Sequence, residues 1–175
     1  HRWVVSSALS LYKSLYPGEL DEKISLCVKS YTDETIDIDG DGAFLERSSG
    51  GYDTIVTQSL MILAKTTEDV ELKKKALAAV EQNLKFNMHL FHADGTIETG
   101  LSRRQDFGIR RINDGLINSY LEYSAISGKA LFQEAAEFLW RSVGSGLIKG
   151  AHWTIRILLL CNLPETAKKA LPISF

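Results

Sequence analysis

A tyrosine and an aspartate that follow two glycines are the first candidates for chemistry in this sequence. The segment runs Ser48-Ser49-Gly50-Gly51-Tyr52-Asp53, and a helical pattern begins directly after it. Glycines let the backbone approach a ligand closely and leave the next side chain exposed at the helix start. A phenol there could transfer protons if a nearby cation lowered its pKa from about 10. The alternative, which spacing alone favours, is that Tyr52 packs at the helix start while Asp53 caps the helix.

Arginines form one basic cluster further along the chain. The segment 102–106 reads Ser-Arg-Arg-Gln-Asp, and a second arginine pair follows at 110–111. Arginines seven and eight positions apart would share one face if a helix ran through them. Guanidinium groups bind carboxylate or sulfate with two parallel hydrogen bonds, which suits an acidic sugar. A solvated face that pairs with Asp106 and Asp114 is the alternative.

The segment 37–42, Asp-Ile-Asp-Gly-Asp-Gly, resembles the start of a calcium-binding loop. The twelfth position, which should supply a bidentate carboxylate, is Ser48, and Glu46 falls two residues early. We therefore interpret this segment as a turn. The histidines also lack the spacing of metal ligands, so we expect no metal and no cofactor. They are His1, His89, His92 and His152.

The composition excludes several classes of protein. The chain has 175 residues, of which 45% are hydrophobic and 24% charged, enough to build a core and unlike a disordered segment. With 20 Lys and Arg against 22 Asp and Glu, it has no global attraction for nucleic acid or anionic membrane. Its longest apolar run, around 157–161, is far shorter than a membrane span. Cys27 and Cys161 fit buried apolar positions.

Helical spacing of apolar residues predicts the elements that must position these groups. Trp3, Val4, Ala8, Leu11, Tyr12 and Leu15 mark a first helix. Further helices are expected at about 20–31, around 55–64, from 70 to beyond 88, and at 108–127, 129–142, 151–162 and 165–171. We expect an all-α fold in a single helical domain over 1–175. Because the chain opens in mid-pattern, we expect it to be part of a larger domain.

A stretch of thirteen residues is echoed later in the chain. Residues 41–53 align without gaps with residues 94–106, and Asp, Gly, Ser and the closing Asp coincide. The offset of 53 residues is about what a pair of antiparallel helices and its loops require. Stacked helix hairpins form a solenoid or a closed ring. In a ring both echoed segments would face one cleft, although Asp-Gly is also simply a good turn sequence.

These motifs, in this order, resemble the α/α-toroid domain of heparinase II/III-like polysaccharide lyases and their bacterial relatives. The resemblance covers roughly residues 1–125. It is carried by His1-Arg2-Trp3-Val4-Val5, by Asp41-Gly42-x-Phe44-x-Glu46 with Gly51-Tyr52-Asp53, and by Asp94-Gly95-Thr96-x-Glu98 with Ser102-Arg103-Arg104-Gln105-Asp106. It implies part of an incomplete (α/α) barrel. In the family a β-sandwich domain follows the barrel, and no part of this chain looks like one.

The resemblance also implies an activity and a set of site residues. In such lyases an Asn-His pair neutralises the carboxylate of a uronate, and a tyrosine about fifty residues later acts as Brønsted acid or base. His1 and Tyr52 match the His and the Tyr, while the Asn would precede the first residue. The implied substrate is an acidic polysaccharide or oligosaccharide, and the implied location is periplasmic or secreted. The implied substrate-binding residues are Trp3, Glu46, Asp53, Glu98, Arg103, Arg104 and Asp106.

Two other functions are compatible with the sequence. One is a glycoside hydrolase on the same kind of helical ring, which would use two carboxylates. Its candidate acids are Asp41, Glu46, Asp53, Asp94, Glu98 and Asp106. The other is a non-catalytic helical repeat that binds glycan or protein.

Overall fold

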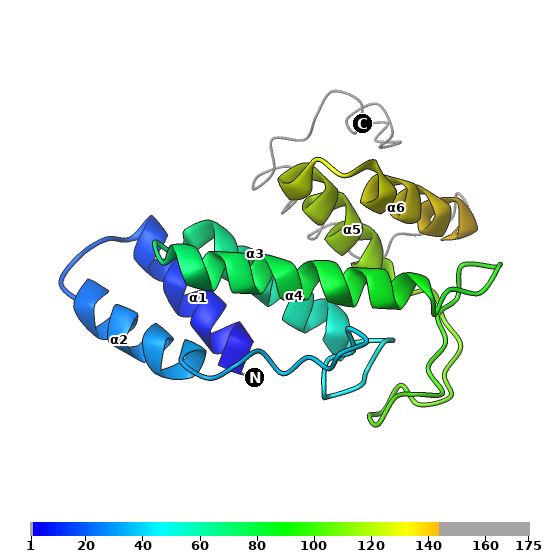
Figure 1. Ribbon diagram of the computed structural model, residues 1–175, viewed down its shortest axis with the longest axis horizontal. Coiled ribbons are helices and arrows are strands. Elements are labelled where there is room, and N and C mark those ends of the chain that lie inside the picture. The colour runs from blue at the N-terminus through cyan, green and yellow to red at the C-terminus, as the bar shows by residue number, and fades with distance from the viewer. Residues whose placement is uncertain (1, 144–175) are drawn as a thin grey trace.

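Six α-helices make up the regular secondary structure of residues 2–143, which are the residues that the computed structural model describes (Figure 1). They are α1 (Arg2–Leu15), α2 (Asp21–Thr32), α3 (Tyr52–Thr66), α4 (Val70–Met88), α5 (Asp114–Ser127) and α6 (Ala130–Val143). Extended pairing in this part of the chain is confined to isolated bridges between loop residues. The predicted all-α class is confirmed. None of these six helices is long and apolar enough to cross a membrane.

The helices pack as three consecutive hairpins. The partners in each hairpin are α1 with α2, α3 with α4, and α5 with α6. The first helices of the hairpins also adjoin one another, so that α3 lies between α1 and α5 (Figure 1). The helices expected at 151–162 and 165–171 lie outside the described residues, as does His1.

Local chemistry explains where α4 and α5 begin and end. The Asp69 carboxylate accepts a hydrogen bond of 3.0 Å from the backbone N–H of Leu72 and so caps α4. Gly128 ends α5 with a φ of 70°, a left-handed conformation that glycine adopts without strain. The apolar period predicts that the fourth helix continues to Phe91, but α4 ends at Met88 because Phe91 pairs with Ile97 in an isolated bridge.

The predicted helix at 108–127 starts six residues too early. Residues 108–113 form the end of a loop, and α5 begins only at Asp114. The reason is that Ile97 donates a backbone hydrogen bond of 3.0 Å to the carbonyl of Arg111, which holds that stretch in extended pairing. No helix runs through the four arginines, so they do not share a helical face. Arg103, Arg104, Arg110 and Arg111 all lie in the loop between α4 and α5.

The main core lies where the three hairpins meet. Its fully buried members come from α3, α4, α5 and α6 and include Leu60, Leu84, Tyr120 and Phe132. The Tyr120 hydroxyl donates a hydrogen bond of 2.7 Å to the backbone carbonyl of Leu84, so the buried phenol is satisfied. This packing fixes α5 against α4 and α6, and with them the loops that the helices carry.

The echoed segments fold into the same turn twice. Asp39 donates its backbone N–H to the carbonyl of Ala43 at 2.9 Å, and 53 residues later His92 donates to Thr96 at 2.8 Å. Isolated bridges join residues 38 and 44 in the first turn and residues 91 and 97 in the second. The internal repeat is therefore a structural repeat, which the shared Asp-Gly residues alone do not guarantee.

Each turn packs on the second helix of the next hairpin. A Cβ built on Gly42 would lie 2.6 Å from the backbone oxygen of Gln82 in α4, and one built on Gly95 would lie 2.2 Å from the Cβ of Ser142 in α6. Both glycines have positive φ, 97° and 77°. Glycine is required at both positions because the backbone of the turn must touch the helix. The Asp-Gly residues of the two turns thus pack against α4 and α6. The segments that follow the turns are the ones that can form a site.

Candidate functional site

The segments that follow the two turns meet, and Asp106 is the residue that joins them. Its carboxylate accepts hydrogen bonds from the hydroxyls of Ser102 and Ser48, at 2.6 and 3.0 Å, and from the backbone N–H of Gly50, at 2.8 Å. Ser48 and Gly50 belong to the first segment, Ser102 and Asp106 to the second. The two echoed segments are therefore in direct contact.

Further polar contacts close the junction. The hydroxyl of Ser49 donates to the backbone carbonyl of Glu98 at 2.7 Å, and the amide of Asn113 donates to the carbonyl of Ser49 at 3.0 Å. The guanidinium of Arg111 donates to the carbonyl of Gly50. A Cβ on Gly50 would lie 2.8 Å from Oδ2 of Asp106, so this glycine admits the second loop in close contact. Gly50 therefore serves the contact between the loops.

The repeat-equivalent residues Asp53 and Asp106 are both buried, with 2% and 4% of their surface exposed. Burial is the largest influence on Asp53 and raises its pKa to about 6, although hydrogen bonds from the Asn83 amide and the Ser48 N–H oppose it. Burial also acts to raise the pKa of Asp106, but the bonds from Ser102, Ser48 and Gly50 outweigh it and hold that pKa below its ordinary 3.8. Both carboxylates bind groups of the chain itself, so they position the loops.

Tyr52 is the first residue of α3 and is partly exposed. Its backbone N–H donates to the hydroxyl of Ser48 at 3.1 Å, so Ser48 satisfies the helix start. The suggestion that Asp53 caps α3 is wrong. The N-cap residue is Gly51, which has no side chain to form a capping hydrogen bond, and the Asp53 carboxylate instead accepts a hydrogen bond from the backbone N–H of Ser48. Because Ser48 accepts this backbone hydrogen bond, the phenol of Tyr52 is not needed at the helix start and lies partly exposed where the two loops meet.

The phenol of Tyr52 is held by two residues of the second loop. The amide of Gln105 donates a hydrogen bond of 3.3 Å to the phenolic oxygen, and the guanidinium carbon of Arg104 lies 4.6 Å from the centre of the ring. Gln105 first, and then the guanidinium of Arg104, lower the pKa of Tyr52 from its ordinary 10.0, against the opposing effects of burial and of Glu46. The cation that proton transfer requires is thus present.

A small hollow of about 60 Å³ lies beside Tyr52. It is lined by Arg2, Trp3, Val4, Asp37, Phe44, Leu45, Glu46, Tyr52, Ile55 and Val56. It is well below the roughly 300 Å³ of a typical small-molecule pocket, so it admits one chemical group of a larger ligand. The structure therefore brings three predicted site residues, Trp3, Glu46 and Tyr52, to one hollow, and places Arg104 against the third.

Arg2 borders this hollow and is held by the loop that follows α2. It bonds to the Asp37 carboxylate at 2.9 Å and also to Glu34 and the carbonyl of Thr35. Its guanidinium carbon lies 4.6 Å from the centre of the Trp3 ring. Its buried Nε has no hydrogen-bond partner within residues 2–143. Arg2 thus places a guanidinium in the lining of the hollow.

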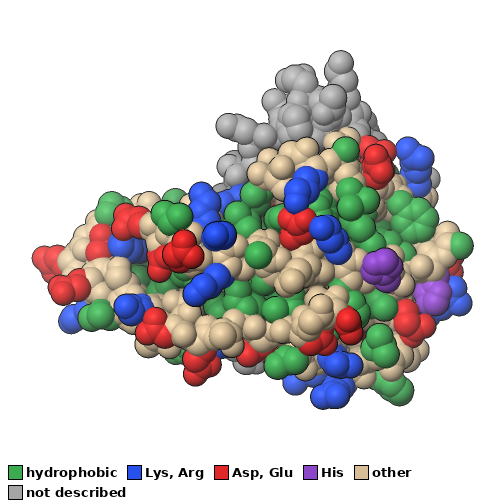
Figure 2. Space-filling model, viewed as in Figure 1, with side chains coloured by type: hydrophobic (Ala, Val, Ile, Leu, Met, Phe, Trp, Pro, Cys, Tyr) green, Lys and Arg blue, Asp and Glu red, His purple; other side chains and the backbone are tan. Residues whose placement is uncertain are grey.

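The remaining predicted residues lie apart from Tyr52. Glu98 accepts from the N–H of Gly100 and lies 3.5 Å from Nε2 of His92, within its own loop. Arg103 is exposed, and its backbone N–H donates to the carbonyl of Arg47 at 2.8 Å. Figure 2 shows acidic and basic side chains interspersed over one face of the molecule, without a continuous field of one sign.

The segment that resembles a calcium loop is a turn stabilised by Asp39. One carboxylate oxygen of Asp39 accepts from the backbone N–H groups of Asp41 and Ala43, at 3.1 and 2.9 Å, and the other lies 3.3 Å from Arg47. Such a turn needs no ion, which supports the interpretation made from the sequence.

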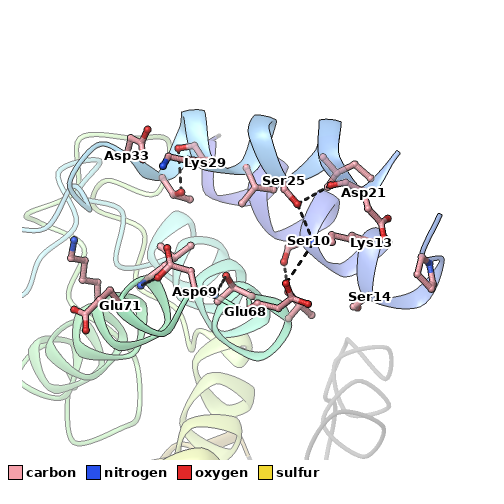
Figure 3. A pocket seen from close by; sticks show the side chains of 18 residues that line it. Ser10, Lys13, Ser14, Asp21, Ser25, Lys29, Asp33, Glu68, Asp69 and Glu71 are labelled. Atoms are coloured by element: carbon pink, nitrogen blue, oxygen red, sulfur yellow. Dashed lines mark hydrogen bonds and ion pairs between the residues drawn. The ribbon is translucent and has the colours of Figure 1, made fainter. Parts of the chain in front are cut away.

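A larger cavity of about 600 Å³ lies between α1, α2 and the connection from α3 to α4 (Figure 3). Serine and threonine hydroxyls and charged side chains line it, and Ser10, Ser25, Lys13, Glu68 and Asp69 are examples. Lys13 bridges its walls by donating to the Ser25 hydroxyl at 3.0 Å and by lying 3.9 Å from the carboxylate of Glu68. None of the predicted site residues lines this cavity.

Sequence reasoning assigned no role to Gln105 or Arg2, which lie beside the predicted residues. The alignment of the repeat held a signal for Gln105, because it occupies the position equivalent to Tyr52. No comparable signal marks Arg2, whose place depends on the packing of α1 against the loop that follows α2.

Comparison of the chain with protein-family models, with curated proteins and with solved structures finds no match.

Proposed function

We propose that this chain is part of the α/α-toroid of a polysaccharide lyase that cleaves uronate-containing glycans by β-elimination. The observation that carries the proposal is the Tyr52 phenol, which is partly exposed, hydrogen-bonded to Gln105 and stacked under the guanidinium of Arg104. Three consecutive helix hairpins, the first two of which are each followed by a turn of the same geometry, agree with a toroid. The motifs that resemble the lyase family include Tyr52 and the loop that holds it.

Tyr52 performs both proton transfers in this proposal. As phenolate it takes the proton from C5 of the uronate, and the electrons of that bond form a C4–C5 double bond. The bond from C4 to the glycosidic oxygen breaks, and the phenol that has just formed returns its proton to that oxygen. No water is consumed. The lowered pKa of Tyr52 makes its phenolate accessible closer to neutral pH than that of an unperturbed tyrosine.

The uronate carboxylate must be stabilised while C5 loses its proton, because the intermediate resembles an enolate. Arg104 beside the phenol and Arg2 in the lining of the hollow supply positive charge near Tyr52. The hollow takes the carboxylate or one neighbouring group, with Trp3 and Glu46 in its wall, and the rest of the polysaccharide lies outside. His1 is proposed, from the resemblance alone, to share this role.

For the hydrolase alternative, the structure reduces the number of carboxylates that are free to act on a substrate. Of its six candidate carboxylates, Asp53 and Asp106 are buried and bonded to the chain, and Asp94 pairs with Arg110 at 3.0 Å. The chemistry of the product separates the two reactions. Incubating the full-length protein with a panel of uronate glycans in ¹⁸O-water should yield products that absorb in the ultraviolet and carry no new ¹⁸O. Products that carry ¹⁸O and lack the double bond would establish hydrolysis, and binding without either product would establish a non-catalytic repeat.

A further inference from the structure

Helix α1 turns its apolar face to solvent. Val4 and Val5 are each 39% exposed, Tyr12 is 47% and Leu15 is 62% exposed, and Ala8 between them is exposed as well. Helical spacing puts these five residues, the apolar stripe, on one face of α1. The charged residues of α1, Arg2 and Lys13, lie outside that face. The stripe is therefore a continuous uncharged surface along the whole helix.

The opposite face of α1 is buried and carries Trp3 and three serines. Ser6, Ser7 and Ser10 have between 0% and 6% of their surface exposed. The hydroxyls of Ser6 and Ser7 bond to carbonyls of the preceding turn of α1, at 2.8 and 3.0 Å. Ser10 accepts a hydrogen bond of 2.7 Å from Thr66, the last residue of α3. These small side chains and Trp3 form the buried side of α1, while most of the apolar residues that predict the helix lie on its exposed side.

The repeat indicates what belongs on the stripe. The equivalent helix of the second hairpin, α3, has a first helix of a neighbouring hairpin on each side, α1 and α5. Among the described helices α1 packs chiefly against α2 and α3, so it has such a neighbour on one side only. Large exposed apolar surfaces on folded proteins mark places where another element docks.

We propose that the apolar stripe is covered by a further helical hairpin of the same polypeptide, one that precedes α1 and whose contacting helix packs on α1 as α1 packs on α3. Its contacting helix presents aliphatic side chains to Val5, Ala8 and Tyr12. Because Val4 lies both on the stripe and in the lining of the hollow beside Tyr52, this hairpin also supplies a second wall to that hollow. The inference rests on α1 and the repeat, and it holds whether or not Tyr52 transfers a proton.

Cysteine accessibility in the full-length protein tests whether the stripe is covered. In a variant without Cys27 and Cys161, a cysteine is introduced by Ala8→Cys, or by Lys74→Cys on the exposed side of α4 as a matched control. We expect the cysteine at position 8 to react with a maleimide at least about tenfold more slowly than the control, at every protein concentration. Equal rates would overturn the proposal, and so would protection that disappears on dilution, because dilution exposes a surface covered by a second copy. If Ala8→Cys does not fold, Tyr12→Cys serves the same comparison.

Photo-crosslinking identifies the element that covers the stripe. A benzophenone amino acid replaces Tyr12, and mass spectrometry maps the adduct after irradiation. An adduct with a segment that precedes α1 is the expected result. An adduct with residues C-terminal to α1, an adduct between two copies, or no adduct at all would contradict the proposal.

Discussion

Tyr52 and Gln105 occupy equivalent positions of the two repeats, and the amide of Gln105 donates a hydrogen bond of 3.3 Å to the phenolic oxygen of Tyr52. The residue that follows each of them is an aspartate, and both aspartates bond to Ser48. The repeat therefore does more than duplicate a turn. It brings two copies of one segment into contact, with a tyrosine on one side and the groups that polarise it on the other.

Removing the guanidinium beside Tyr52 should raise the pKa of the phenol. If the phenolate is the base, the rate of β-elimination rises with pH through that pKa. Arg104→Gln is expected to move this rising limb to higher pH, since a source of the lowered pKa is lost. The measurement is a pH–rate profile of the full-length protein, with Lys74→Gln as a control that removes one exposed positive charge from α4. A limb that stays in place in Arg104→Gln would show that Tyr52 is not the titrating base.

The close contact between the first turn and α4 makes Gly42 sensitive to a single methyl group. In Gly42→Ala the new Cβ would lie 2.6 Å from the Gln82 oxygen, at a φ of 97°. We expect a loss of unfolding free energy of about 2–3 kcal/mol by urea denaturation. Gly40→Ala, two residues away, meets nothing within 4 Å and should change stability by less than about 0.5 kcal/mol. Equal effects of the two substitutions would contradict the packing of the turn on α4.

Burial of Asp53 makes stability depend on pH in a defined window. Its pKa of about 6 in the folded protein lies above the ordinary 3.8, so the folded state binds more protons between these values. Stability should therefore fall as pH rises from about 4 to about 6, by about 3 kcal/mol from this group, and then level off. Comparing the pH dependence of unfolding in the wild type and in Asp53→Asn isolates the contribution. A difference between the two proteins that is constant across this window would contradict an elevated pKa.

Asp106 carries the contact between the two segments, so its removal should affect stability and activity together. Asp106→Ala leaves two hydroxyls and one backbone N–H without their charged acceptor. We expect a destabilisation of about 2–4 kcal/mol, measured by thermal or urea unfolding, with weaker activity because Gln105 and Arg104 lose their support. Asp41→Ala, at an exposed position of the first turn, should change stability by less than about 0.5 kcal/mol. A fully stable Asp106→Ala protein would show that other contacts hold the loops.

The sequence contains strong signals for the helices and weak ones for the site. Apolar spacing and the cap at Asp69 locate α4 well, since both are local properties. The start of α5 is not predictable in this way, because the extended backbone at Arg111 is fixed by pairing with Ile97, fourteen residues earlier. The same loop carries the four arginines, so the spacing rule of a helix does not apply to them.

Besides long-range backbone pairing, local sequence patterns do not reveal which polar side chains are buried. Asp53 and Asp106 are polar and follow glycine-rich or arginine-rich segments, so they suggest substrate contacts, yet both are enclosed by the junction of the two loops. In α1 the apolar spacing predicts the helix correctly, but of the residues that carry it only Trp3 is buried, and the rest of the buried face consists of serines. The alignment of the repeat did relate residues far apart in the sequence, and the two segments that it pairs are in contact in the structure.

The most direct test of the central claim is the rate at which unsaturated uronate products form when Tyr52 loses its hydroxyl. Tyr52→Phe keeps the ring under Arg104 and removes only the group that would carry the proton. In the full-length protein, followed by ultraviolet absorbance on an acidic polysaccharide, we expect the rate to fall by at least about 100-fold, while the fold and glycan binding are retained. Tyr16→Phe, at an exposed tyrosine just past α1, should leave the rate unchanged. Product formation by Tyr52→Phe at the wild-type rate would contradict the account.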